Sequence, residues 1–189
     1  MIVNIILEKN AKMPVRAHRT DAGFDIYTSE TIYVPAHKRT IVPTGIRIQM
    51  KDNRPRFIRW IDRLINGEFC YEALIDPRSG LSARGMEGMD ENPSTTPYGI
   101  EPARYRYDCD VIEGKIDMGY TDPIGVILDN KGRGFFLPKG LRIAQMTFVR
   151  VACPKFVEVK SLEETQVRGL GFGAPLLIHI TSGCPFRLP

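Results

Sequence analysis

The chain has 189 residues, the length of one domain, and its 43% of hydrophobic and 25% of charged residues are ordinary for a globular protein. The net charge is only +4 and no dense run of lysine and arginine occurs, so we expect no nucleic acid partner. No apolar run approaches the ~20 residues that span a bilayer, and we expect no membrane partner.

The dominant period of the hydrophobic residues is two, which is the period of a half-buried β-strand. Residues 3–7, 46–50 and 105–111 alternate in this way, and residues 46–50 do so most clearly. Residues 124–128 and 146–151 are apolar runs, and we expect strands that are buried on both faces or nearly so.

Turn signals separate these runs, so the pattern indicates an all-β sandwich or barrel. The signals are Val34-Pro35, Pro43-Thr44-Gly45, Asn130-Lys131-Gly132 and Leu137-Pro138-Lys139-Gly140.

One segment departs from the period of two, because its apolar residues recur at helical spacing before Asn66-Gly67, which can end a helix. These residues are Phe57, Trp60, Ile61, Leu64 and Ile65. They predict a short amphipathic helix inserted into an all-β chain. The cations of this segment are interpreted as a solvated helix face, with contact to nucleic acid or to a partner as the alternative. They are Lys51, Arg54, Arg56, Arg59 and Arg63.

The four cysteines are widely separated and include no CxxC pair, which argues against a metal cluster or a disulfide framework. They are Cys70, Cys109, Cys153 and Cys184. We expect buried free thiols in a reducing compartment. The N-terminal segment is too short and polar for a signal peptide, so we expect the protein to be cytoplasmic.

Five short segments stand out: DAGFD at 21–25, PRSGL at 77–81, GKIDMGY at 114–120, GLRIAQM at 140–146 and RGLGFG at 168–173. Any one of them alone is better explained as an ordinary turn or helix cap. In this order, however, they match the five motifs of the trimeric dUTPase family, which the chain resembles from motif one to motif five.

This resemblance implies a distorted jelly-roll β-barrel or sandwich with a short inserted helix, assembled as a homotrimer. It also implies hydrolysis of dUTP to dUMP and pyrophosphate with Mg²⁺, which lowers dUTP and supplies dUMP for thymidylate synthesis. On this basis residues 1–189 form a single dUTPase-like domain, with insertions near 51–68 and 83–104 and a C-terminal arm from about residue 166.

Cleavage of a triphosphate between its α and β phosphorus atoms requires an oriented water, cationic neutralisation and a metal on the phosphates. Arg78 offers forked donors, and the backbone at Ser79 and Gly80 can cradle phosphate oxygens. By resemblance these residues bind the α- and β-phosphates, while Asp25 is a supporting carboxylate that fixes an arginine or a metal-bound water. Mg²⁺ is expected on the triphosphate through water, with no direct protein ligand.

The expected catalytic base is Asp117, which lies at the end of a predicted strand. By resemblance it orients and activates the attacking water. Gln145 has a donor and an acceptor, and by resemblance it holds the same water, either from a neighbouring subunit or from the same edge of the cleft. Arg142 is expected to be structural and to pair at the subunit contact.

The nucleoside is expected to bind the third motif. By resemblance Tyr120 packs beneath the deoxyribose, where a ribose 2′-hydroxyl would clash. The main chain of a hairpin at 111–117, including Val111, Gly114 and Ile116, is the expected reader of uracil, because peptide N–H and C=O groups can mimic a base-pairing edge.

The glycine-rich fifth motif is expected to be a mobile lid. Arg168 would reach the γ-phosphate, Phe172 would lie over the uracil, and Gly173 is expected to contact the substrate. The family has hydroxyl residues where this chain has Ala174-Pro175, so we expect the lid to close less tightly.

Three other functions compete with dUTP hydrolysis. A dCTP deaminase shares the fold but needs a glutamate on the strand after the third motif, and residues 124–128 contain no carboxylate. A nucleotide-binding regulatory protein could use the two insertions as docking surfaces. A structural jelly-roll subunit would have no use for five polar motifs.

Overall fold

The computed structural model describes residues 1–90 and 104–161. The chain divides into two compact units, Met1–Pro154 and Lys155–Pro189, and the first carries every helix and strand among the described residues. Several predictions lie outside the described residues: the lid, most of the insertion at 83–104, and the residues Arg168, Phe172, Gly173, Ala174, Pro175 and Cys184. The single-domain organisation also stays a prediction.

Three antiparallel four-stranded sheets build the first unit. The first has the order β1 (Ile2–Leu7), β4 (Arg39–Lys51), β10 (Ile124–Asn130) and β8 (Cys109–Ile112). The second has the order β2 (Phe24–Tyr27), β12 (Arg142–Ala152), β5 (Phe69–Asp76) and β9 (Gly114–Asp117). The third has the order β3 (Ile32–Val34), β11 (Phe135–Leu137), β6 (Met86–Met89) and β7 (Arg104–Tyr107). The helices are α1 (Arg56–Asn66) and α2 (Ser79–Arg84).

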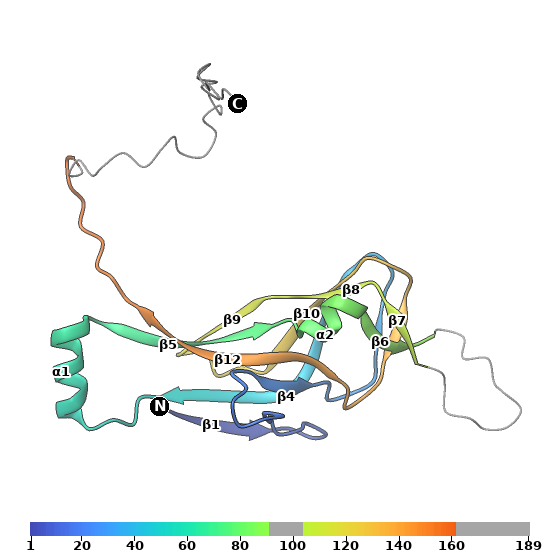
Figure 1. Cartoon of the computed structure of the whole chain (residues 1–189), viewed down its shortest axis with the longest axis horizontal. Helices are drawn as coiled ribbons and strands as arrows, with labels where there is room; N and C mark the ends of the chain where they lie inside the picture. The colour runs from blue at the N-terminus through green and yellow to red at the C-terminus, as the bar shows by residue number, and fades with distance from the viewer. Residues whose placement is uncertain (91–103, 162–189) are drawn as a thin grey trace, which may run out of the picture. The chain divides into compact units, whose positions relative to one another are not determined.

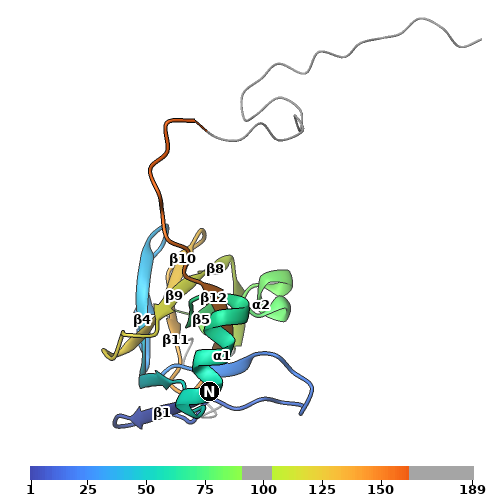
Figure 2. The ribbon, with the colours of Figure 1, turned by 90° about the vertical axis from the view of Figure 1, so that its left-hand side faces the viewer.

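The first and second sheets form two layers, with β4 on one side and β5 and β12 on the other (Figures 1 and 2). The period of two explains the core, because alternate residues of each strand point between the layers. Ile46, Ile48 and Met50 of β4 are at most 3% exposed, and Ile75 and Met146 of the second sheet are 2% exposed. The predicted all-β fold with one inserted helix is confirmed.

The two apolar runs are strands, as expected, but their two faces are not equally buried. In β10 the buried residues are Ile124, Val126, Leu128 and Asn130, and the residues between them are partly exposed. In β12 the residues after Met146 are partly or fully exposed. One face of each antiparallel sheet points away from the core. Burial therefore alternates along β10 and falls along β12 after Met146, although neither sequence alternates in polarity.

The turn predicted at Pro43-Thr44-Gly45 is also wrong, because β4 continues through it. Its pairing with β10 shifts there, so that Ile124 lies opposite Ile46 and Gly125 lies opposite Pro43. The two extra residues form a β-bulge, which Gly45 permits with its φ of +65°. The side chain of Thr44 is fully buried and donates to the carbonyl of Ile124 at 2.6 Å.

Replacing Gly45 by alanine is expected to lower the free energy of unfolding by about 1–3 kcal/mol, because the positive φ disfavours any Cβ. The new Cβ would also lie 3.0 Å from that of Ala11 and 3.2 Å from that of Ser29. Urea unfolding at one fixed protein concentration measures the effect. Gly119→Ala is the control, since nothing lies within 4 Å of its Cβ position. Equal stability of the two variants would contradict this account of the bulge.

The stretch from 104 to 117 changes sheet twice. Its alternation predicted one strand at 105–111, but β7 pairs with β6 in the third sheet, whereas β8 pairs with β10 in the first. After Glu113 the chain enters the second sheet, where β9 pairs with β5. The hairpin predicted at 111–117 is therefore wrong, because β8 and β9 belong to different sheets.

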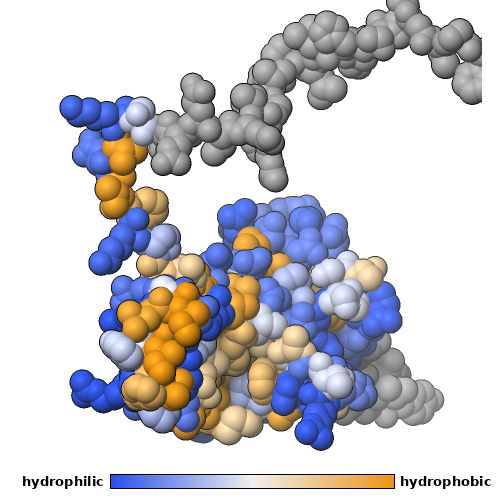
Figure 3. Space-filling view, turned by 60° about the vertical axis from the view of Figure 1, so that its left-hand side comes forward, coloured by the Kyte–Doolittle hydropathy of each residue, from blue (hydrophilic) through white to orange (hydrophobic). Residues whose placement is uncertain are grey.

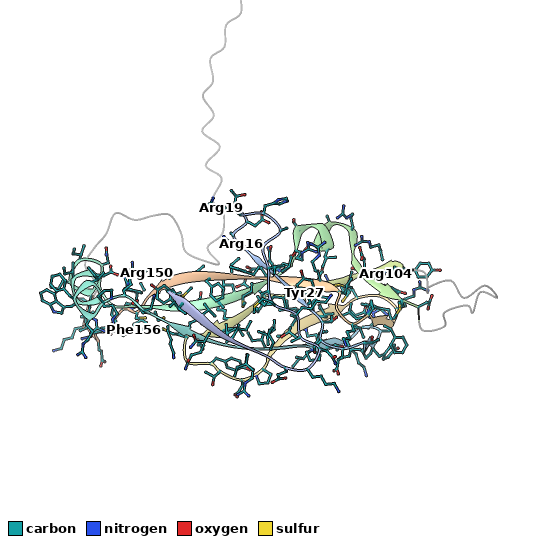
Figure 4. All side chains as sticks on the ribbon, turned by 90° about the horizontal axis from the view of Figure 1, so that it is seen from below. Arg16, Arg19, Tyr27, Arg104, Arg150 and Phe156 are labelled. Carbon is teal, nitrogen blue, oxygen red and sulfur yellow. The ribbon has the colours of Figure 1, made fainter. Side chains whose placement is uncertain are left out.

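The predicted helix is confirmed as α1, which ends at Gly67, but its orientation is unusual. Its buried residue is Asp62, which accepts hydrogen bonds from Arg54 at 2.6 Å, from Asn66 at 2.5 Å and from Arg150 of β12 at 3.0 Å. These bonds make the burial of a carboxylate tolerable. They fasten α1 to one end of the two layers, where Figure 4 shows Arg150 beside it.

The three cysteines among the described residues are free, as expected, but only Cys109 is buried. Burial raises the pKa of its thiol to about 12. Cys70 and Cys153 are partly exposed, which corrects the expectation of uniformly buried thiols. Within residues 1–90 and 104–161, no helix is long and apolar enough to cross a membrane.

Candidate active site

The first, second and fourth motifs meet around Asp25, which is the central carboxylate of the site. Asp25 lies on β2 and is 8% exposed. It accepts a hydrogen bond from Nη1 of Arg142 at 3.0 Å and forms an ion pair with Nε of Arg78 at 3.0 Å. A buried carboxylate is stable when two cations share it, and in return it holds both guanidinium groups in place. The contact agrees with the expectation that Asp25 fixes an arginine, and Arg142 pairs with it inside the chain.

Gln145 joins the same group from β12, where it lies opposite both Asp25 and Asp76. Its Nε2 donates to the carbonyl of Pro77 at 3.2 Å. A Cβ on Gly23 would lie 2.9 Å from the amide oxygen of Gln145, so only glycine leaves room for this side chain. The sequence interpretation missed Gly23, although its place inside the first motif could have suggested it.

Ser79 and Gly80 form the first turn of α2 directly after Arg78. The first amides of a helix have no partner within the helix, so they remain available to an anion that approaches Arg78. The cradle predicted from the sequence as a loop is thus a helical turn. Leu81 is 8% exposed and anchors this turn on the core.

A cavity of about 340 Å³ opens beside Arg78, between α2 and the 138–142 segment. Four cations line it, and Glu87 is the only carboxylate among its described lining residues. The cations are Arg78, Arg104, Lys139 and Arg142. This surplus of positive charge suits a polyanionic ligand.

The third motif places Asp117 at the end of β9, exposed to solvent. Its carbonyl accepts from the backbone N–H of Tyr120 at 2.9 Å, which closes a tight turn. The Tyr120 hydroxyl donates to the carbonyl of Pro123 at 3.0 Å, and the residue remains 39% exposed. The turn therefore presents an acidic group and an aromatic ring side by side on the surface. Val111, by contrast, is buried in the core, so it can offer a ligand only its backbone.

Within one chain the structure does not bring Asp117 to Gln145. Asp117 pairs with Glu72 on one side of β5, and Gln145 pairs with Asp76 on the other side. The four steps from Glu72 to Asp76 along β5 span ~13 Å, and β9 and β12 are two strand spacings, or ~10 Å, apart. The Cα atoms of Asp117 and Gln145 are therefore roughly 16 Å apart. One water cannot bind both groups of a single chain. Among the described residues, no cluster of three or more metal-binding side chains occurs.

Comparisons with known proteins agree with the motifs. The family model described as dUTPase matches residues 9–58 and 105–175. A deoxyuridine 5'-triphosphate nucleotidohydrolase from Clostridium tetani is 31% identical, with coverage of 89% of this chain and 92% of that relative. The protein of the same name from Crocosphaera subtropica is 33% identical, with coverage of 92% and 98%. The Cowpox virus protein of that name is 32% identical, with coverage of 91% of each chain.

Solved structures show the same fold. A dUTPase mutant from phage phi11 of Staphylococcus aureus matches with a TM-score of 0.62 and 19% identity, covering 87% of this chain and all of that one. The dUTPase of Staphylococcus bacteriophage 80alpha, bound to dUpNHpp, matches with a TM-score of 0.64 and 22% identity, covering 89% and 94%. The distorted jelly-roll is thereby confirmed. With a family match over more than half of its length and several relatives above 30% identity, the chain belongs to the dUTPase family.

Proposed function

We propose that the protein hydrolyses dUTP to dUMP and pyrophosphate. The observation that carries this proposal is the group formed by Asp25, Arg78, Arg142 and Gln145, which joins three of the five motifs at one place. The relatives are named deoxyuridine 5'-triphosphate nucleotidohydrolases, and this chain matches them over nearly their whole length. This match supports the same substrate.

The chemistry divides between binding charge and activating water. Arg78 and the first amides of α2 neutralise the phosphate oxygens, and the cations of the adjacent cavity extend this field. Asp117 accepts a proton from the attacking water, while Gln145 orients that water through its amide. The bond between the bridging oxygen and the attacked phosphorus breaks, and pyrophosphate leaves with dUMP as the other product.

Mg²⁺ fits this site as an ion carried by the triphosphate. It prefers phosphate and water oxygens and needs few protein ligands. Asp25 is the carboxylate proposed to hold a water bound to this ion. When bound, the ion would neutralise charge on the phosphates. A neighbouring phi11 structure is described as showing a structural Mg(II) ion in that protein.

We propose a homotrimer in which each site combines Asp117 and Tyr120 of one copy with Arg78 and Gln145 of another. The support is the separation of roughly 16 Å across β5, which one chain cannot close. Of the alternatives left open for Gln145, this favours the neighbouring subunit. Arg168, Phe172 and Gly173 are proposed to complete the site as a lid, and the backbone at Gly114 and Ile116 is proposed to read uracil.

A substrate panel tests the reaction. Pyrophosphate is expected from dUTP with Mg²⁺, at rates well above those with dTTP, dCTP or UTP, because Tyr120 and the third motif select deoxyribose and uracil. Chelation of Mg²⁺ is expected to suppress turnover. Ammonia is assayed in parallel with dCTP: its release would replace the proposal by deamination. Equal turnover of all four nucleotides would contradict the assigned nucleoside site.

The protein is also proposed to be cytoplasmic. The support is the free state of Cys70, Cys109 and Cys153, since oxidising compartments favour disulfides.

A further inference from the structure

The insertion that carries α1 presents a hydrophobic surface that nothing in the reaction uses. Five large side chains, Phe57, Ile58, Trp60, Leu64 and Ile65, are each between 45% and 74% exposed. We call them the outer face of α1. Figure 3 shows a hydrophobic patch at this end of the molecule. An exposed patch of this kind costs solvation free energy and marks a surface that binds something.

The fold holds this face outward. Most surface helices turn their apolar side to the core, whereas α1 turns Asp62 inward and fixes it with Arg54 and Arg150. The guanidinium of Arg150 also lies 3.4 Å from the ring centroid of Phe69, the first residue of β5. The inward face is thus specified by three charged groups and an aromatic ring, so the exposure of the outer face is built into the structure.

The charges beside the outer face are positive. Asp62 is the only carboxylate in α1, and it is buried and paired. The cations Arg56 and Arg59 are exposed and have no ion pair among the described residues, while Arg63 pairs with Glu68 at 3.0 Å. A ligand for this surface is therefore apolar where it meets the outer face and anionic at its edge.

We propose that the outer face of α1 binds an anionic lipid surface. An amphipathic helix with aromatic and aliphatic residues on one side and arginine on the other is suited to lie in the interface of a bilayer. Such binding needs one apolar face, whereas spanning a bilayer needs ~20 apolar residues. The rings of Phe57 and Trp60 stack with centroids 6.3 Å apart and form an aromatic surface of the type found at lipid headgroup level.

The width of the apolar arc favours lipid over the other occupants. At ~100° per residue, the apolar positions of α1 cover about 160° of its circumference. A protein groove takes a narrow stripe, such as Phe57, Trp60 and Leu64, and would leave Ile58 and Ile65 in water. A second copy of α1 would likewise contact only a stripe of this arc and leave its edges in water.

Vesicle binding tests the proposal with the full chain. The probes are phosphatidylcholine vesicles and vesicles containing about 30% phosphatidylglycerol, which reproduce a neutral and an anionic surface. Trp60 is the only tryptophan, so its emission reports the outer face directly. With the anionic vesicles we expect sedimentation and a blue shift of Trp60 emission. Binding to the neutral vesicles should be weaker by roughly tenfold or more.

Variants separate the apolar and the charged contributions. Leu64→Ser with Ile65→Ser should abolish vesicle binding, and Arg56→Glu with Arg59→Glu should abolish the preference for anionic lipid. Ile41→Ser is the matched control, because Ile41 is 68% exposed on β4, and it should bind like the parent protein. Pyrophosphate release from dUTP, measured for each variant, verifies that the fold is intact.

Several outcomes would overturn the proposal. These are no binding to either vesicle, equal binding to both, or a Leu64→Ser, Ile65→Ser variant that binds like the parent. A Trp60 shift with an acidic Leu- and Glu-rich helical peptide, but with no vesicle, would assign the face to a protein partner. A particle mass that falls in the Leu64→Ser, Ile65→Ser variant without lipid would assign it to a second copy.

Discussion

Replacing Asp117 by asparagine is expected to lower kcat for dUTP by about 10²-fold or more, the usual scale for a positioned general base. Asparagine keeps the shape of the side chain and the turn to Tyr120, whose bond to residue 117 uses the backbone carbonyl. It cannot accept the proton of the attacking water as the carboxylate does. KM should change little, because the phosphate-binding residues are on other elements.

Steady-state assays of pyrophosphate release measure this effect, and binding of a non-hydrolysable dUTP analogue verifies that the site is intact. Glu72→Gln is a matched control, because Glu72 lies directly opposite Asp117 on β5 and its replacement by glutamine removes the same charge. Its kcat should stay within a few fold of the parent value. Near-normal kcat in Asp117→Asn would remove Asp117 from the chemistry, and equal losses in both variants would point to a general electrostatic effect.

The second large effect is recovery of activity from two inactive proteins. Asp117→Asn and Gln145→Ala should each be nearly inactive alone. If each site takes Asp117 from one copy and Gln145 from another, random mixed trimers restore about a quarter of the sites, because each of the two chains is intact half of the time. This follows from the roughly 16 Å that separate the two residues across β5.

The mixture is made by unfolding and refolding both variants together, and activity is compared with the separately refolded proteins. The control is a mixture of Asp117→Asn with a double variant that carries both Asp117→Asn and Gln145→Ala. It should stay inactive, since no chain then supplies an intact Asp117. A site that lies within one chain would give no recovery in either mixture, and the trimeric site would have to be abandoned.

The sequence predicts those features that local pattern controls. Alternation at Ile46, Ile48 and Met50 is enough to identify β4 and its buried face, and helical spacing before Gly67 is enough to identify α1. Family motifs suggest candidate site residues because each motif is short and contiguous. That Arg78 and Arg142 meet at Asp25 follows from the pairing of β12 with both β2 and β5, which joins residues far apart along the chain.

What the sequence did not predict depends on distant partners. Periodicity shows that α1 has an apolar side but not which side faces inward, and that choice is made by Arg150, which lies 88 positions from Asp62. The sequence around Gly45 predicts a turn where the structure has a bulge, because glycine with a positive φ serves in both. The change of sheet at Glu113 carries no local signal, since β8 and β9 look like consecutive strands of a hairpin.

The bonds around Asp62 also determine how the insertion responds to acid. Hydrogen bonds from Arg54, then from Asn66 and Arg150, hold the pKa of Asp62 well below its ordinary value of 3.8. A hydrogen bond from Arg54 lowers the pKa of Asp52 to about 2. A carboxyl group with a depressed pKa stabilises the folded state above its unfolded-state pKa and loses this contribution as pH falls through the folded-state value. The fastening of α1 is therefore complete from neutrality down to about pH 5 and is released only in strong acid. Mild acidification leaves the outer face where it is, so its exposure is a permanent property and not a switch.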